Sequence, residues 1–97
     1  MMEYFDFSGK VIIEFYSDGC LNCQMMAPII KSLEYYFPDI RFYRINADQR
    51  PDLTQKHQVT SIPSLLLFHN GRKLTTIVGA KPEHLIRNII HNTLDYA

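Results

Sequence analysis

The sequence predicts an α/β fold, with one mixed four-stranded sheet (element order β-α-β-α-β-β-α) and helices on both of its faces. Three observations lead to this prediction. An apolar run over residues 11–16 is typical of a strand buried on both faces. Two longer segments repeat their apolar residues at the spacing of an amphipathic helix. The dipeptide Asn70-Gly71, between two β-prone segments, indicates a two-residue hairpin.

Strands are expected in four places. Residues 11–16 form a central strand, and residues 41–46 form a second strand with β-prone side chains. The Asn-Gly hairpin joins residues 64–69 to residues 74–78. Because a long helical segment separates the first two strands, they are expected to pair in parallel.

Three helices are expected between and after these strands. The first covers residues 20–37 and would face the sheet with a stripe formed by Met26, Ile29, Ile30, Leu33 and Phe37. A short helix over residues 51–57 begins with a proline, which is favoured in a first helical turn. The last helix begins at Pro82, and its expected buried stripe consists of Leu85, Ile86, Ile89, Ile90 and Leu94.

Length and composition indicate a single domain over residues 1–97. The chain has 46% hydrophobic and 21% charged residues, which is ordinary for a globular protein with one core. Its net charge is zero, which argues against binding to nucleic acid or to a membrane surface. No apolar run is long enough to cross a bilayer and no secretory signal opens the chain, so a cytoplasmic protein is expected.

Cys20 and Cys23 are the only cysteines of the chain. A disulfide closing so short a loop would stabilise the fold little, so chemistry explains the pair better than stability does. Cys20 is expected at a helix start, where unpaired backbone N–H groups and the helix dipole favour a thiolate. Cys23 follows one turn later on nearly the same face, which allows a disulfide to close. The pattern therefore predicts a redox pair.

Two other interpretations of the cysteines stay open. They are two buried structural thiols, or half of a zinc site. A zinc site needs about four ligands. The other candidate ligands show no C-x-x-C or H-x-x-x-H spacing that would complete one; they are His57, His69, His84 and His91. No metal site is therefore expected.

From residue 10 to the last helix, the sequence resembles the thioredoxin family. The matching segments are residues 11–16, 27–28, 46–51, 61–68, 70–71 and 78–80. Agreement in so many segments, in order, is more specific than the C-x-x-C spacing alone. The resemblance implies a thioredoxin-like fold and an enzyme that reduces protein disulfides by dithiol exchange. It also implies no cofactor beyond the redox-active Cys20–Cys23 disulfide.

The resemblance further implies a substrate groove opposite the cysteines. Pro63 would be a cis proline facing them, and the backbone of Ile62 would pair with an extended substrate peptide. Gly79 would let the substrate backbone approach. Pro28 matches the helix-kinking proline of the family, a structural role. The alternative for Pro63 is a proline that merely begins the third strand.

Glu14 is a carboxylate within an otherwise apolar strand, where burial is costly without a partner or a purpose. Thioredoxins commonly have an aspartate here, so the resemblance implies that Glu14 assists proton transfer at Cys23. Arg44 falls where the family usually has a lysine, and from the neighbouring strand it would pair with Glu14. A structural Glu14–Arg44 ion pair without a proton-transfer role is the alternative.

The sequence departs from the family around the cysteines. The usual tryptophan before the first cysteine is replaced by Gly19, and the usual Gly-Pro between the cysteines by Leu21-Asn22. Residues at these positions touch substrate and tune the relative stability of dithiol and disulfide. Asn22 restores a backbone N–H that proline lacks, so a pair somewhat more oxidising than that of a typical thioredoxin is expected.

The segment before the first strand is also shorter than in the family, which has a strand and a helix there. The strand at residues 41–46 would therefore have an open edge, and open edges are usually covered or paired. An aromatic cluster of Tyr4, Phe5 and Phe7 is expected to cover this edge, or to form a homodimer through it.

The expected mechanism begins with attack of Cys20 on a substrate disulfide and ends with resolution by Cys23. The implied partners are disulfide-containing proteins and a separate reductase such as thioredoxin reductase. Three alternatives remain: a glutaredoxin-like, glutathione-dependent reductase, a non-enzymatic client-binding module, and a metal or iron–sulfur centre bridging two chains.

Overall fold

The computed structural model describes residues 5–95 and contains the expected elements in the expected order. They are β1 (Lys10–Tyr16), α1 (Leu21–Tyr36), β2 (Ile40–Asn46), α2 (Pro51–Lys56), β3 (Ser64–His69), β4 (Arg72–Val78) and α3 (Glu83–Leu94). Each begins within two residues of its expected position. The main difference is in the hairpin, where β4 begins directly after the turn.

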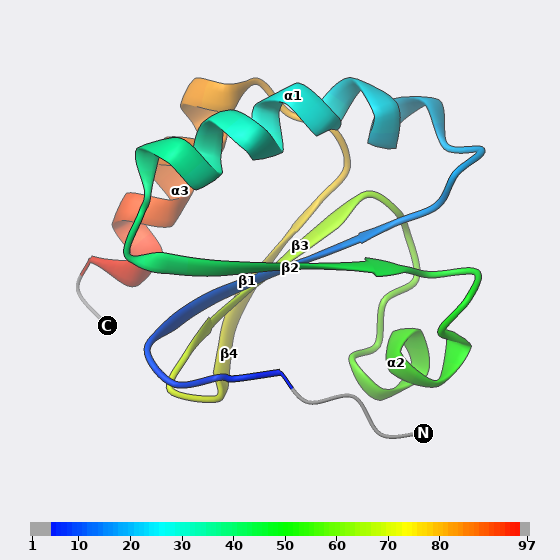
Figure 1. Cartoon of the computed structure of the whole chain (residues 1–97), viewed down its shortest axis with the longest axis horizontal. Helices are drawn as coiled ribbons and strands as arrows, with labels where there is room; N and C mark the ends of the chain where they lie inside the picture. Colours follow the sequence, from blue (N-terminus) through cyan, green and yellow to red (C-terminus); the bar gives the residue numbers. More distant parts are fainter. Residues whose placement is uncertain (1–4, 96–97) are drawn as a thin grey trace.

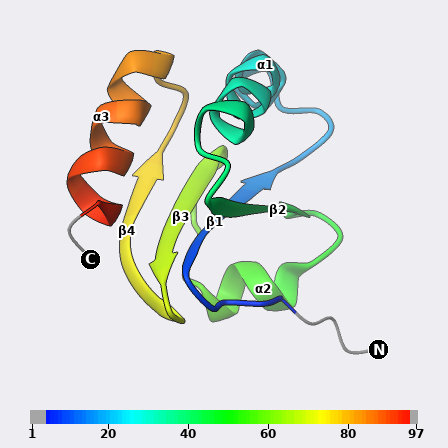
Figure 2. The ribbon, with the colours of Figure 1, turned by 60° about the vertical axis from the view of Figure 1, so that its left-hand side comes forward.

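The four strands form one mixed sheet in the order β2-β1-β3-β4 (Figures 1 and 2). β1 pairs in parallel with β2 and antiparallel with β3, and β4 completes the sheet antiparallel to β3. β1 and β3 are therefore central, which is why both are nearly continuous runs of buried residues. The edge strands β2 and β4 carry more polar and exposed side chains.

The hairpin between β3 and β4 has the two-residue turn that its sequence predicts. Asn70 and Gly71 have φ angles of 50° and 85°, and His69 pairs directly with Arg72. Left-handed conformation at both turn positions matches the twist of the flanking strands, and Asn-Gly adopts it readily. The turn is also joined to the start of the chain, because Asn70 exchanges two hydrogen bonds with Gly9, at 2.7 and 2.9 Å.

The core consists of two clusters, one on each face of the sheet. In Figure 1, α1 and α3 lie on one side of the sheet and α2 lies on the other. The first cluster, beneath α1 and α3, includes Ile12, Met26, Leu33, Leu67, Ile86 and Ile90. The second cluster lies on the α2 side and includes Val11, Ile13, Phe15, Ile45, Leu66 and Phe68. Alternate residues of β1 thus enter opposite cores, as the pleat of a strand requires.

Leu85 corrects the predicted stripe of the last helix. Ile86, Ile90 and Leu94 are fully buried and Ile89 is partly buried, but Leu85 is 40% exposed. A helix turns by about 100° per residue, so Leu85 lies well away from the centre of the 86–90–94 stripe and faces outward. In α1 the predicted stripe is buried apart from Ile29, which is only partly covered.

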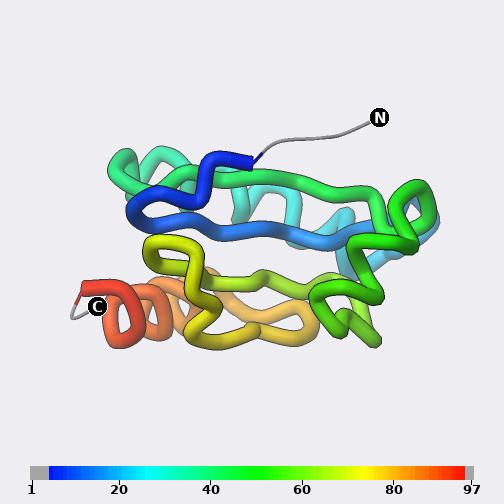
Figure 3. Tube along the Cα trace, turned by 90° about the horizontal axis from the view of Figure 1, so that it is seen from below, coloured from blue at the N-terminus to red at the C-terminus, as the bar shows by residue number. Residues whose placement is uncertain are grey.

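The chain before β1 lies against β2 on the α2 side of the sheet (Figure 3). The ring of Phe5 packs edge-on against Tyr43 at 4.8 Å, and the backbone N–H of Asp6 donates to the Tyr43 hydroxyl at 2.9 Å. Phe7 packs on Phe68 at 5.0 Å. Within residues 5–95, no backbone–backbone hydrogen bond joins this segment to β2, so it covers side chains beside the edge without adding a strand. Tyr4, the third member of the predicted aromatic cluster, lies outside the described residues.

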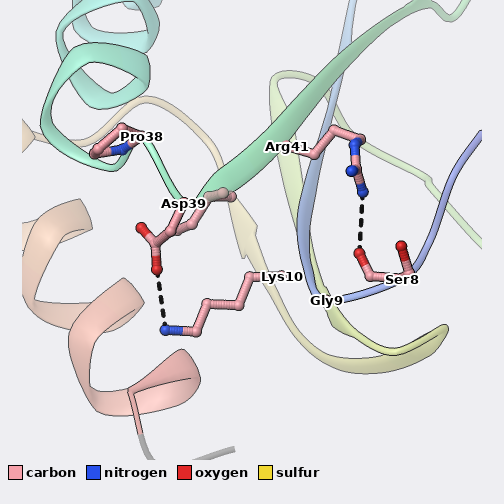
Figure 4. Close-up of a pocket in the computed structure, with 7 residues that line it drawn as sticks. Ser8, Gly9, Lys10, Pro38, Asp39 and Arg41 are labelled. Atoms are coloured by element: carbon pink, nitrogen blue, oxygen red, sulfur yellow. Dashed lines mark hydrogen bonds and ion pairs between the residues drawn. The ribbon is translucent and has the colours of Figure 1, made fainter.

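A polar pocket of about 500 Å³ lies where this segment enters β1 and where β2 begins (Figure 4). Lys10 pairs with Asp39 at 3.3 Å across it. Arg41 donates to the carbonyl oxygen of Ser8 at 3.0 Å. These contacts attach the segment before β1 to the end of the sheet opposite the cysteines.

Within residues 5–95, no helix is long and apolar enough to cross a membrane.

Candidate redox site

Cys20 and Cys23 form a disulfide at the start of α1, with their Cα atoms 5.2 Å apart. A turn connects the end of β1 to the start of the helix. It is closed by a hydrogen bond from the Cys20 N–H to the Ser17 carbonyl, at 3.4 Å. The structure thus joins the predicted pair at the carboxyl end of a central strand.

Cys20 is the N-cap residue of α1. Its backbone is extended (φ −90°, ψ 110°), and its Sγ accepts a hydrogen bond from the Cys23 N–H at 3.0 Å. The first N–H groups of a helix have no partner within it, so a sulfur at the N-cap can accept from them, and the helix dipole favours negative charge there. The same geometry would stabilise a Cys20 thiolate once the disulfide is reduced.

The two sulfur-bearing residues differ in exposure. Cys23 is 3% exposed and packs with the core, whereas Cys20 is only half-buried. A large substrate can therefore reach Cys20 but not Cys23. The neighbouring Gly19, Leu21 and Asn22, which are three of the six predicted substrate contacts, are exposed.

Glu14 is buried on the face of the sheet that carries α1. It is 1% exposed, and its Oε1 accepts a hydrogen bond from the Arg44 Nε at 2.8 Å. The β1–β2 register places these two residues directly opposite each other. The predicted ion pair therefore forms. The other carboxylate oxygen, Oε2, has no hydrogen-bond partner within the described part of the chain, and no hydrogen bond joins Glu14 to Cys23.

Arg44 also contacts Tyr16, a residue that sequence reasoning missed. The guanidinium carbon lies 4.0 Å from the centre of the Tyr16 ring, in a cation–π arrangement. Both side chains line a pocket of about 240 Å³ together with Cys23, Gln24 and Asp18, among others. Arg44 therefore lies between buried Glu14 and a pocket that reaches the buried cysteine. A β-strand places residues 14 and 16 on one face, which is the signal that could have linked Tyr16 to the site.

Pro63 and Gly79 meet at the same end of the sheet. The Gly79 N–H donates to the Pro63 carbonyl at 2.8 Å, and the Ile62–Pro63 peptide bond is cis. Gly79 has φ +88°, a conformation that favours glycine, and a Cβ added there would meet no atom within 4 Å. Pro63 immediately precedes β3, whose first residue pairs with Phe15 of β1. The cysteine turn and the Pro63–Gly79 pair therefore lie on neighbouring strand ends.

Pro28 lies inside α1 and is exposed. Within residues 5–95 no group of three or more His, Cys, Asp or Glu side chains is arranged to hold a metal ion.

The sequence profile of the thioredoxin family matches residues 4–92. The chain belongs to the thioredoxin family.

Similar sequences and structures agree with this assignment. The chain is 37% identical to thioredoxin-1 of Saccharomyces cerevisiae over 82 residues, which is 84% of this chain and 80% of that protein. It is 32% identical to a thioredoxin of Chlamydia pneumoniae, over 87% of this chain and 82% of that protein. Among solved structures, oxidised mitochondrial thioredoxin 3 of S. cerevisiae superposes with a TM-score of 0.79 at 34% identity, covering 84% of this chain and 77% of that one. A mutant thioredoxin of Halobacterium salinarum gives 0.83 at 28% identity, with 90% and 76% covered.

This thioredoxin family member is a thiol-disulfide oxidoreductase, since it combines the family sequence and fold with a disulfide at the C-x-x-C position. Its redox group is part of the chain. The predicted family and fold, and the predicted class of enzyme, are therefore confirmed.

Proposed function

We propose that Cys20 is the attacking cysteine and Cys23 the resolving one. The observation that carries this assignment is their difference in exposure, with Cys23 3% exposed and Cys20 half-buried at the helix N-cap. The Cys20 thiolate attacks one sulfur of a substrate disulfide and forms a mixed disulfide, and one substrate thiolate leaves. Cys23 then attacks the Cys20 sulfur. The second substrate thiol is released, and the two electrons given to the substrate leave a Cys20–Cys23 disulfide.

Glu14 is proposed to accept the proton of Cys23 in the resolving step. Its side chain points to the face that carries α1, and the unpartnered Oε2 is available while Oε1 is held by Arg44. Because no hydrogen bond joins Glu14 to Cys23, the proton transfer would need one bridging water between the two side chains. The competing role for Glu14 is a structural ion pair alone.

Substrate is proposed to lie over the Ile62–Pro63 bond and Gly79. The hydrogen bond between Gly79 and Pro63 holds these two backbones together, and the space above Gly79 is open. Gly19, Leu21 and Asn22 form the opposite rim. This arrangement supports binding of an extended polypeptide whose cysteine meets Cys20.

Reduction of insulin disulfides by a chemical or enzymatic electron donor tests the assignment. Wild-type protein is expected to accelerate insulin precipitation, and Cys20→Ser to lose this activity entirely. A binding module without enzymatic activity would bind insulin in both forms and accelerate nothing. Dependence on glutathione as the sole donor would instead support the glutaredoxin-like alternative.

The redox pair is further proposed to be more oxidising than that of a typical thioredoxin. Asn22 contributes a backbone N–H to the first turn of α1, two residues after Cys20, where proline would contribute none. Additional N–H donors stabilise the thiolate and hence the reduced form. A measured potential at or below about −270 mV, the thioredoxin value, would contradict this.

The remaining proposals concern the setting of the enzyme. We propose a single domain over residues 1–97, reduced in the cytoplasm by a separate reductase such as thioredoxin reductase. The two-cysteine content suits a reducing compartment, although related thioredoxins include mitochondrial and chloroplastic proteins.

Packing of Phe5 and Phe7 against the same chain supports a monomer over a homodimer at the β2 edge. Light scattering at high protein concentration distinguishes the two.

A further inference from the structure

Apolar side chains lie exposed on the first turns of α1, beside the redox pair. Leu21 is 70% exposed and Met25 is 60% exposed. Ile29, one further turn along, is only partly covered. Residues four apart lie on one face of a helix, so these three side chains form a continuous row that begins directly after Cys20. Large apolar side chains grouped in this way at a surface mark a binding site more often than scattered ones do.

This row borders a pocket of about 300 Å³ between α1 and the connection from β4 to α3. Figure 2 shows that connection rising from β4 to the start of α3. The pocket, here called the anchor pocket, is lined by Met25, Met26, Ile29, Ala80, Lys81 and Pro82. Gly79 directly precedes the lining residues of the connection. The anchor pocket is therefore continuous with the surface over which substrate is proposed to lie.

We propose that the anchor pocket binds an aliphatic side chain of the protein substrate, two to four residues away from the substrate cysteine that Cys20 attacks. This inference rests on the proposed function, because it takes Cys20 as the point where the substrate sulfur is held. The occupant is a disulfide-bearing polypeptide with leucine, isoleucine, valine or methionine at that spacing.

The spacing follows from the geometry of a helix and of an extended chain. Met25 and Ile29 lie five and nine residues after Cys20, and a helix rises about 1.5 Å per residue, so the pocket begins about 8 Å and ends about 14 Å from the cysteine. An extended peptide advances about 3.3 Å per residue. The pocket is thus reached two to four residues from the reacting cysteine.

The lining determines which side chain fits. Lys81 is the one charged residue among those that line the anchor pocket, and its Nζ donates to the Val78 carbonyl at 2.9 Å. Its ammonium group is therefore held at the β4 end of the pocket, while the remaining lining is apolar. A lysine or arginine anchor would meet this like charge, and a serine would bury too little apolar surface to gain from the pocket.

The surface on the other side of the redox pair carries charged side chains. A substrate with one aliphatic anchor would therefore bind with its chain running in one direction only. There the pocket beside Cys23 is lined by Asp18, Gln24 and Arg44, with Gln24 donating to the Asp18 carbonyl at 3.1 Å. That pocket also includes Tyr16 and Ala27, but its charged Asp18 and Arg44 make it less favourable for an aliphatic side chain than the anchor pocket is. The aliphatic preference is accordingly expected on one side of the substrate cysteine only.

Peptide disulfides of defined sequence test the proposal. Each peptide carries one cysteine as a mixed disulfide with 5-thio-2-nitrobenzoate, with leucine, serine or lysine placed three residues before or after it. Pre-reduced wild-type protein gives its two electrons to this disulfide, so it ends as the Cys20–Cys23 disulfide and releases the peptide thiol and the coloured thiolate. On one side of the cysteine, the leucine peptide is expected to react about tenfold faster than the serine peptide, and the lysine peptide no faster than serine.

Three variants distinguish a contribution of the anchor pocket from a general change in activity. Met25→Ser is expected to reduce the leucine preference to less than twofold. Ala80→Glu adds an acid at the pocket and is expected to make the lysine peptide faster than the serine peptide. Tyr35→Ser, a change at a 90% exposed aromatic residue on the same helix but outside the pocket, is expected to leave the preference intact.

Equal rates for leucine and serine peptides on both sides of the cysteine would overturn the anchor pocket and leave the proposed function standing. An unchanged leucine preference in Met25→Ser, in a variant with wild-type thermal unfolding, would also overturn it. Release of no coloured thiolate from any peptide would overturn the proposed function itself.

Discussion

The carboxylate of Glu14 is buried between a salt-bridging arginine and the helix that carries both cysteines. Its Oε1 is bound to Arg44 at 2.8 Å, while Oε2 has no partner within residues 5–95. A purely structural ion pair would use both oxygens if it could, because an unsatisfied buried acceptor is costly. The free oxygen is what favours a role in proton transfer.

Glu14→Gln tests this role. The substitution keeps the shape of the side chain but removes the proton acceptor, so turnover with insulin is expected to fall about tenfold or more at neutral pH. The deficit should shrink as the pH rises and Cys23 ionises without help. Arg44→Gln is the matched control, since it breaks the same ion pair but leaves the carboxylate in place. Equal turnover of wild type and Glu14→Gln at every pH would show that Glu14 is structural.

His57 is expected to make stability depend on pH. Burial lowers the pKa of His57 below its usual 6.5, and nearby Lys56 and Lys73 lower it further. Its ring packs near Phe15 and Phe68, at 6.1 and 5.9 Å between centroids. The unfolded chain therefore binds this proton more tightly than the folded one, so stability is lost as the pH falls below about 6.5.

Urea unfolding at pH 7.5 and pH 5.0 measures this effect. The loss of stability between the two values is expected to be smaller in His57→Gln than in wild type. His84→Gln, at an exposed position on α3, serves as the control and should retain the wild-type loss. An identical loss in wild type and His57→Gln would contradict the assignment to His57.

Among the secondary-structure elements, the β3–β4 hairpin depends most directly on a single residue, Gly71 in its turn. Gly71 has φ +85°, and a Cβ added there would meet no atom within 4 Å, so the cost of a side chain is conformational alone. Gly71→Ala is expected to reduce the free energy of unfolding by about 1 kcal/mol. Gly19→Ala is the control, because Gly19 also has open space around it but no positive φ. Comparable losses in both variants, measured by urea unfolding, would contradict this account.

Elements and their order were predictable because each depends on chemistry close in the sequence. Asn70 and Gly71 accept the left-handed turn, the apolar run of β1 requires burial on both faces, and Cys20 caps the helix that follows it. The stacking of Arg44 on Tyr16 was not predictable, since it depends on how two strands place long side chains over the same face. The anchor pocket joins α1 to a connection more than fifty residues later, and the exposure of Leu85 depends on the exact rotation of α3.

On the α2 side of the molecule, the segment before β1 covers part of the hydrophobic core. Phe7 lies at 5.0 Å from Phe68 of the central strand β3, so this short segment covers apolar surface that would otherwise face water. Phe7→Ala is expected to lower the free energy of unfolding by about 2 kcal/mol, less than for a fully buried phenylalanine. Tyr35→Ala, at a 90% exposed position, should change it by less than about 0.5 kcal/mol. Equal effects of the two substitutions would show that the segment contributes nothing to the fold.

In the proposed mechanism, Cys20 forms the bond to the substrate and Cys23 breaks it. Mass spectrometry of mixed disulfides tests this: pre-reduced Cys23→Ser and pre-reduced Cys20→Ser are each mixed with insulin whose disulfides are intact, so that attack by the remaining thiol forms the adduct and releases one substrate thiolate. A stable adduct is expected in Cys23→Ser, mapped to the peptide that contains Cys20, and none in Cys20→Ser. An adduct of equal yield on Cys23 in the Cys20→Ser protein, or no adduct in either variant, would contradict it.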